Sequence, residues 1–148
     1  MRVAALLAVI ICGLAVAGCR SAGKGQAPQF AAVEIEGNTP GQIRDVAAEV
    51  FRSHGFRVAQ AGLASMVFEK EGTGMDNAAY GDWMGGKVWI RVKASIIAVS
   101  ERNFRLECNA YMVQDKGVTG IEQEIKLSKF RRGRYQKLLD EVASRLGK

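Results

Sequence analysis

The stretch "KVWIRVKASIIAV", residues 87–99, decides the fold because apolar side chains stand at every second position along it. This period of two is typical of a β-strand that buries one of its faces. The stretch "FRLECNAYMV", residues 104–113, repeats the pattern after a short connection and places Cys108 on the buried face. Because strands joined by short connections pair antiparallel, the two stretches predict one antiparallel pair of a sheet.

Further strands are predicted on both sides of this pair. The same alternation marks residues 31–37, 56–60, 64–70 and 119–127. In the last of these, Ile121, Ile125 and Leu127 are expected to face inward, and Glu122 and Glu124 outward. The chain therefore supplies enough strands for a sheet of five to six.

Two segments carry the period of an amphipathic helix. The first begins at "TPGQ", residues 39–42, where Thr39 and Gln42 match a capping box and Pro40 suits the first turn. This helix is expected to end at Gly55, since glycine readily takes the left-handed conformation of a helix end. The second helix closes the chain, with one apolar stripe made by Tyr135, Leu138, Leu139, Val142 and Leu146.

The order of these elements predicts an α+β fold. Short connections require antiparallel pairing, and two amphipathic helices need one face of the sheet to cover. We therefore expect a two-layer sandwich, with a mainly antiparallel sheet and both helices packed on one face. Residues 30–148 are enough for one domain with a single core, without disulfides or a structural metal.

The first 18 residues have the composition of a secretory signal peptide. Arg2 precedes an uninterrupted apolar run of 15 residues, which is shorter than the roughly 20 that span a bilayer as a helix. The run ends in "VAGC", residues 16–19, which resembles the lipobox of bacterial lipoproteins. An ordinary signal peptide with a chance cysteine, or a short apolar helix that is not cleaved, remains the alternative.

The resemblance to bacterial lipoproteins implies a covalent membrane anchor. In that family the thiol of the lipobox cysteine, here Cys19, is diacylated, the chain is cut before it, and the new amino terminus is acylated. Residues 19–29 then form the lipidated cysteine and a flexible tether rich in small and polar residues. Arg20 stands where aspartate tends to retain lipoproteins in the inner membrane, so the resemblance favours the outer membrane, on its periplasmic or surface side.

Composition argues against several classes of function. The chain has one histidine, His54, and Cys108 is the only cysteine beyond the signal and the lipobox, so no metal site and no cofactor are expected. A net charge of +6 suits a domain held beside anionic lipid or wall polymer. An exported location argues against nucleic acid as a partner.

Residues 71–86, "EGTGMDNAAYGDWMGG", form an unusually long connection. One interpretation is a binding lip, in which Tyr80 and Trp83 offer flat apolar faces while Asp76 and Asp82 offer hydrogen bonds. The alternative is that Trp83 plugs the edge of the core. A third interpretation makes Asp76 and Asp82 the carboxylate pair of a weak hydrolase.

The outward face of residues 87–99 interleaves cations with Trp89. Lys87, Arg91 and Lys93 alternate with this ring, and the neighbouring strand adds Tyr111. Such a face suits stacking on sugars or lying at a lipid interface. The alternative is a solvated sheet face, where the aliphatic stems of lysine and arginine shield the rings.

A cluster of cations opens the final helix. It contains Lys129, Arg131, Arg132, Arg134 and Lys137, within "KFRRGRYQK", residues 129–137. Cations at this position oppose the positive end of the helix dipole. Glu107, Glu122 and Glu124 are expected to reach across to them, or solvent screens them; the alternative is a bound phosphate or carboxylate from outside.

Together these patterns predict a membrane-anchored envelope lipoprotein that is not an enzyme. Its domain is expected to act as a binding or scaffold module for a partner protein, an anionic lipid or a wall polymer. The alternative function is a weak envelope hydrolase that uses the carboxylates of residues 71–86.

Overall fold

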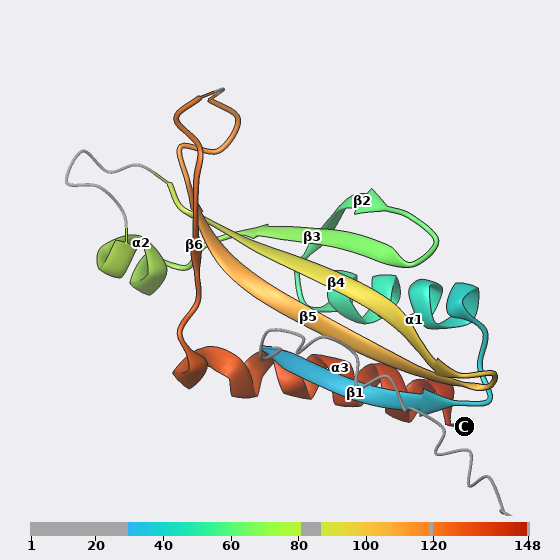
Figure 1. The fold of residues 1–148 in the computed structure, drawn as a ribbon. Coiled ribbons are helices and arrows are strands. Elements are labelled where there is room, and N and C mark those ends of the chain that lie inside the picture. The colour runs from blue at the N-terminus through green and yellow to red at the C-terminus, as the bar shows by residue number, and fades with distance from the viewer. Residues whose placement is uncertain (1–29, 81–86, 119, 148) are drawn as a thin grey trace, which may run out of the picture.

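The computed structural model describes residues 30–80, 87–118 and 120–147. These residues form an α+β sandwich with a six-stranded sheet, as predicted (Figure 1). All strand pairs are antiparallel, and the strand order is β1-β5-β4-β3-β2, with β6 also pairing with β5. The strands are β1 (Ala31–Glu36), β2 (Arg57–Ala61), β3 (Ser65–Glu71), β4 (Trp89–Ser100), β5 (Asn103–Gln114) and β6 (Gln123–Lys126).

The pair β4 and β5 forms the middle of the sheet. Ala94 lies opposite Cys108, so the apolar side chains of both strands share one face. The outer edge of β5 is divided between two strands: β1 pairs with its first half and β6 with its last four residues. The first and last strands of the domain, β1 and β6, therefore lie along the same edge of β5.

Helix α1 (Pro40–Ser53) begins and ends where the sequence predicts. Thr39 and Gln42 form the capping box, and Gly55 has a φ of +82°. Phe56 then folds back, so that its ring lies 5.3 Å from the ring of Phe51.

Helix α3 (Arg132–Leu146) follows a single 3-10 turn, η1 (Lys129–Arg131). It packs against β1 and α1, with Tyr135, Leu138, Leu139 and Val142 buried. Figure 1 shows α1 and α3 on the same side of the sheet, which encloses the core between the two layers.

The structure corrects, for the part that it describes, the expectation that residues 71–86 form one long connection without a helix. Residues 74–80 form a short helix, α2 (Gly74–Tyr80), at one end of the sheet (Figure 1). The backbone N–H of Thr73 donates to Asp76 (2.9 Å) and the N–H of Asp76 donates to the Thr73 hydroxyl (3.3 Å). This reciprocal cap, made by "TGMD", starts the helix in spite of its glycine.

The expectation that Ile121 and Ile125 are buried is wrong. Their exposed fractions are 56% and 42%, whereas Leu127 is buried as expected. Ile125 lies opposite Met112 and so shares the core face, but β6 is a short edge strand, and the helices pack on other strands. The period of two predicted which face of the sheet the Ile125 side chain lies on. It did not predict that the helices leave this face uncovered at β6.

Candidate functional site

The strongest candidate site lies where β6 meets α3. We call it the basic corner, meaning η1 together with residues 132–137 of α3. Leu127 fixes its position: the side chain is buried, and its backbone N–H donates to the carbonyl of Ala110 at 2.9 Å. The chain then turns away from the sheet through η1 and enters α3, which brings the predicted cations of residues 129–137 onto one end of the helical layer.

Asp76 of α2 holds this corner in place. Its side chain accepts hydrogen bonds from the N–H and hydroxyl of Thr73, at 2.9 and 2.8 Å, and from the Arg131 guanidinium at 2.5 Å. Burial alone would raise the pKa of this carboxyl, but the hydrogen bonds from Thr73 and Arg131 outweigh burial and lower it. Asp76 is therefore an ionised structural anchor between α2 and the start of α3.

The four other cations of the corner have no such partner. Lys129, Arg132, Arg134 and Lys137 are all exposed, and none forms an ion pair with any residue that the structure describes. Burial lowers the pKa of Lys70 on β3, and the nearby charge of Arg134 lowers it further. Positive charge is thus concentrated here, and the described residues do not supply a carboxylate for each cation.

The structure corrects the expectation that Glu107, Glu122 and Glu124 compensate these cations. Glu122 and Glu124 each accept from Arg91 at 2.6 Å, and Glu124 also accepts from Lys93. Glu107 lies 3.4 Å from Arg105 on its own strand. The carboxylate that does reach the corner, Asp76, belongs to the segment expected to be a loop.

The surface of the corner is hollowed and partly apolar. A depression of about 360 Å³ lies between α2 and α3, lined among others by Met75, Asp76, Phe130, Arg134 and Tyr135. Phe130 and Met75 have exposed fractions of 101% and 78%. Sequence reasoning did not identify Phe130, because a single aromatic residue among cations carries no periodic signal.

The outer face of the sheet carries a second cluster of charges, centred on Arg91. This side chain donates to Glu69, Glu122 and Glu124, and Lys116 also binds Glu69. Burial raises the pKa of Glu69, but Lys116 and Arg91 lower it more, so the carboxylate stays ionised. Here each buried charge has partners within the protein.

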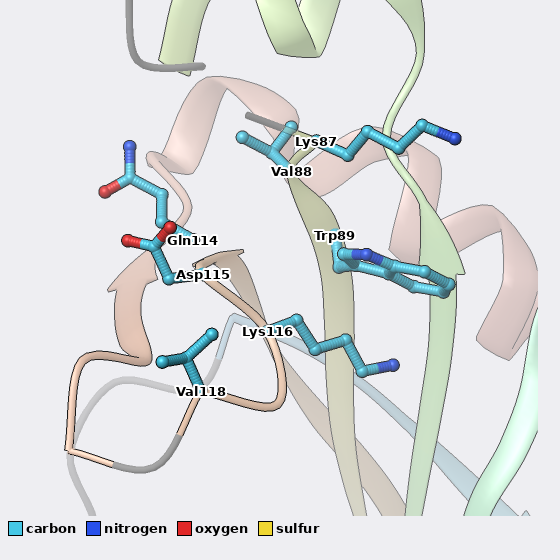
Figure 2. Close-up of a pocket in the computed structure, with 7 residues that line it drawn as sticks. All are labelled: Lys87, Val88, Trp89, Gln114, Asp115, Lys116 and Val118. Carbon is cyan, nitrogen blue, oxygen red and sulfur yellow. The ribbon is translucent and has the colours of Figure 1, made fainter. Parts of the chain in front are cut away.

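Trp89 lies at the edge of this cluster. The Lys116 ammonium is 3.8 Å from the centroid of its ring, and the Arg57 guanidinium is 4.5 Å away. Figure 2 shows the Lys116 side chain running alongside the ring, in a pocket of about 260 Å³ that Val88 and Val118 also line. Two cations of the protein itself thus lie over the Trp89 ring, which the sequence analysis considered as a stacking surface for a ligand.

The structure describes only some of the other candidate site residues in the segment 71–86. Tyr80 is the last residue of α2, and nothing is described of its side chain. Asp82 and Trp83 lie outside the described residues. Asp76 has a lowered pKa, whereas a glycosidase-type general acid needs a raised one, so this carboxyl is a poor proton donor.

No described group offers evident catalytic or metal chemistry. Burial raises the pKa of Cys108 to about 12, which keeps its thiol protonated, and the His54 ring lies 2.8 Å from Glu141 at the surface. Within the described ranges no cluster of His, Cys, Asp and Glu is placed to hold a metal ion. The helices described there also include none of the length and apolarity needed to cross a bilayer.

The chain matches no family model and no curated protein sequence.

Proposed function

We propose that this protein is a lipid-anchored lipoprotein of the bacterial envelope, and that its domain is a non-catalytic module that binds an anionic envelope component. The basic corner is its binding surface. The single observation that carries this proposal is the set of four exposed cations, Lys129, Arg132, Arg134 and Lys137, that have no ion-pair partner among the described residues.

The basic corner suits an external anion better than the outer sheet face does. On the outer face, Arg91 is bound by three glutamates and Trp89 is covered by two cations. At the corner, the dipole of α3 adds positive potential to that of the exposed cations. An anion placed there meets arginine forks and the positive end of the helix dipole together.

The anchor follows from the sequence. The motif "VAGC", residues 16–19, ends an apolar run and supplies Cys19 as the acyl acceptor. Two or more acyl chains give stable membrane attachment, whereas one gives only reversible binding. A cationic domain attached in this way stays beside a surface rich in phosphate and carboxylate groups.

The test of the anchor is the intact mass of the protein extracted from membranes of a bacterium that expresses the full chain. We expect the mature protein to begin at Cys19 and to carry three acyl chains. Cys19→Ser should leave residues 1–18 attached and the chain without lipid, while the matched variant Cys12→Ser should be processed normally. A mature protein without acyl chains, or cleavage at the same bond in Cys19→Ser, would overturn the anchor.

A further inference from the structure

We infer that the anionic component met by the basic corner is the phospholipid bilayer itself, and that Phe130 inserts into it. This inference rests on the proposed function, because it takes the domain to be held near a membrane by its lipid. It adds the partner, the orientation of the domain and the side chain that enters the lipid.

The pattern of side chains on η1 suits insertion into a bilayer. Phe130 is 101% exposed, and it stands between Lys129 and Arg131 on a single turn that projects from the end of α3. Arg132 and Arg134 follow at the start of α3, and both are also exposed. An exposed aromatic residue with cations next to it in the chain is the arrangement with which peripheral proteins enter the interface of anionic bilayers.

The turn that carries Phe130 is held in place on both sides. Asp76 binds Arg131, and the Arg131 N–H donates to the carbonyl of Ser128 at 3.0 Å. On the other side of Phe130, Leu127 is buried in the core. Phe130 is thus presented by a fixed backbone, so little conformational freedom is lost when the ring enters lipid.

The chain enters the domain close to the basic corner. The Phe30 ring lies 5.4 Å from that of Tyr135, and Gln136 exchanges hydrogen bonds with the backbone of Ala32. The segment from the proposed anchor therefore reaches the fold beside the first two turns of α3. Cys19 is eleven residues before Phe30, a length of chain that spans at most about 40 Å. Attachment at Cys19 keeps the corner within reach of the bilayer and raises its effective concentration there.

The exposed aromatic ring favours a bilayer over a charged polymer. A wall polymer or polysaccharide satisfies the cations and can stack on one ring, but it has no apolar interior that would bury both Phe130 and Met75, which lines the same depression. A bilayer satisfies both, because phosphate groups lie directly above the acyl region. Binding to a protein partner or to a polymer would give a different result in the test described next.

The test uses the lipidated full-length product reconstituted on vesicles of phosphatidylglycerol or phosphatidylcholine with brominated acyl chains, which quench tryptophan fluorescence on contact. Phe130→Trp is compared with Leu63→Trp, a matched control 73% exposed in the turn between β2 and β3. The unsubstituted chain gives the background from Trp83 and Trp89. Both substituted side chains are exposed, so folding is not at risk.

We expect Phe130→Trp to show a blue-shifted, quenched emission on phosphatidylglycerol, and the emission of a water-exposed indole on phosphatidylcholine. Leu63→Trp should remain unquenched on both. Added salt should reverse the quenching of Phe130→Trp. If the protein stays on both kinds of vesicle but the emission of Phe130→Trp is not selectively quenched, the inference about the bilayer is overturned. The proposed function then stands, with a polymer or a protein as the partner. Protein retained on neither would overturn the proposed anchor, and the inference with it.

Discussion

Asp76 and Arg131, 55 positions apart in the sequence, are joined by a hydrogen bond of 2.5 Å that ties α2 to the start of α3. The same carboxylate caps α2 through Thr73. One side chain therefore fixes a short helix and neutralises one cation of the basic corner. Arg131 is structural for this reason, and Arg132 and Arg134 are the residues to change when binding is tested.

We expect Asp76→Asn to lower the free energy of unfolding by about 1–3 kcal/mol, because a buried cap loses its charge while Arg131 loses its partner. Urea denaturation at neutral pH measures this. Asp140→Asn, a matched change at an exposed position of α3, should alter stability by no more than about 0.5 kcal/mol. Equal effects of the two variants would contradict the anchoring role of Asp76.

Stability should fall at acid pH because of Asp76 and Glu69. Their pKa values are lowered in the folded protein, so the unfolded chain binds more protons as pH falls toward the ordinary carboxyl pKa of about 4. The stabilisation is complete above that value and is lost as pH drops through the folded-state pKa. Urea midpoints between pH 7 and pH 3 should show this loss, and Asp76→Asn with Glu69→Gln should flatten it. An unchanged slope in the double variant would assign the pH dependence to other groups.

Gly72 is required by a close approach of two chain segments. A Cβ at this position would lie 2.7 Å from Cγ2 of Val88 and 3.0 Å from its carbonyl oxygen, where Gly72 itself donates a hydrogen bond. Gly72→Ala should therefore destabilise the protein by about 1–3 kcal/mol through overpacking. Gly74→Ala is the control, since a Cβ there meets nothing within 4 Å, and it should leave stability unchanged or slightly higher. Thermal unfolding of both variants compares them directly.

The charge cluster of the outer face is expected to support the fold. Arg91→Met would leave Glu69 buried with fewer partners, and should cost about 1–3 kcal/mol. Lys93→Met removes a more exposed partner of Glu124 and should cost at most about 1 kcal/mol. If Arg91→Met were as stable as the parent protein in urea, the cluster would no longer account for the burial of Glu69.

Local signals made most of the fold predictable. The capping box of α1 lies within four consecutive residues, and the alternation of β4 and β5 is long enough to indicate both strands and their buried face. Helix α2 carried a signal of the same kind, since Thr73 and Asp76 have the spacing of a capping box. The glycines in this segment favour the interpretation as a loop, and this outweighs the signal of the cap made by Thr73 and Asp76.

Long-range pairing explains what the sequence did not predict. The outward direction of Glu122 and Glu124 follows from alternation, but their partner, Arg91, depends on the register of β6 against β5 and β5 against β4. The link from Asp76 to Arg131 depends on where two helices end in space. Ile121 and Ile125 have the predicted period, yet no short pattern states how far the helical layer extends.

The central claim, that the basic corner is the surface that meets an anionic component, is tested most directly by hydrogen exchange on the vesicle-anchored protein. A bound anionic surface should shield the first turn of α3 and stabilise it against local opening, and so slow the exchange of its amides. We predict slower exchange at residues 129–135 on phosphatidylglycerol than on phosphatidylcholine. Arg132→Gln with Arg134→Gln should abolish the difference. The charge-matched pair Arg52→Gln with Arg102→Gln, at exposed positions on α1 and in the β4–β5 turn, should preserve it. Equal exchange of these amides on both lipids, or a difference confined to the outer face of the sheet, would contradict the account.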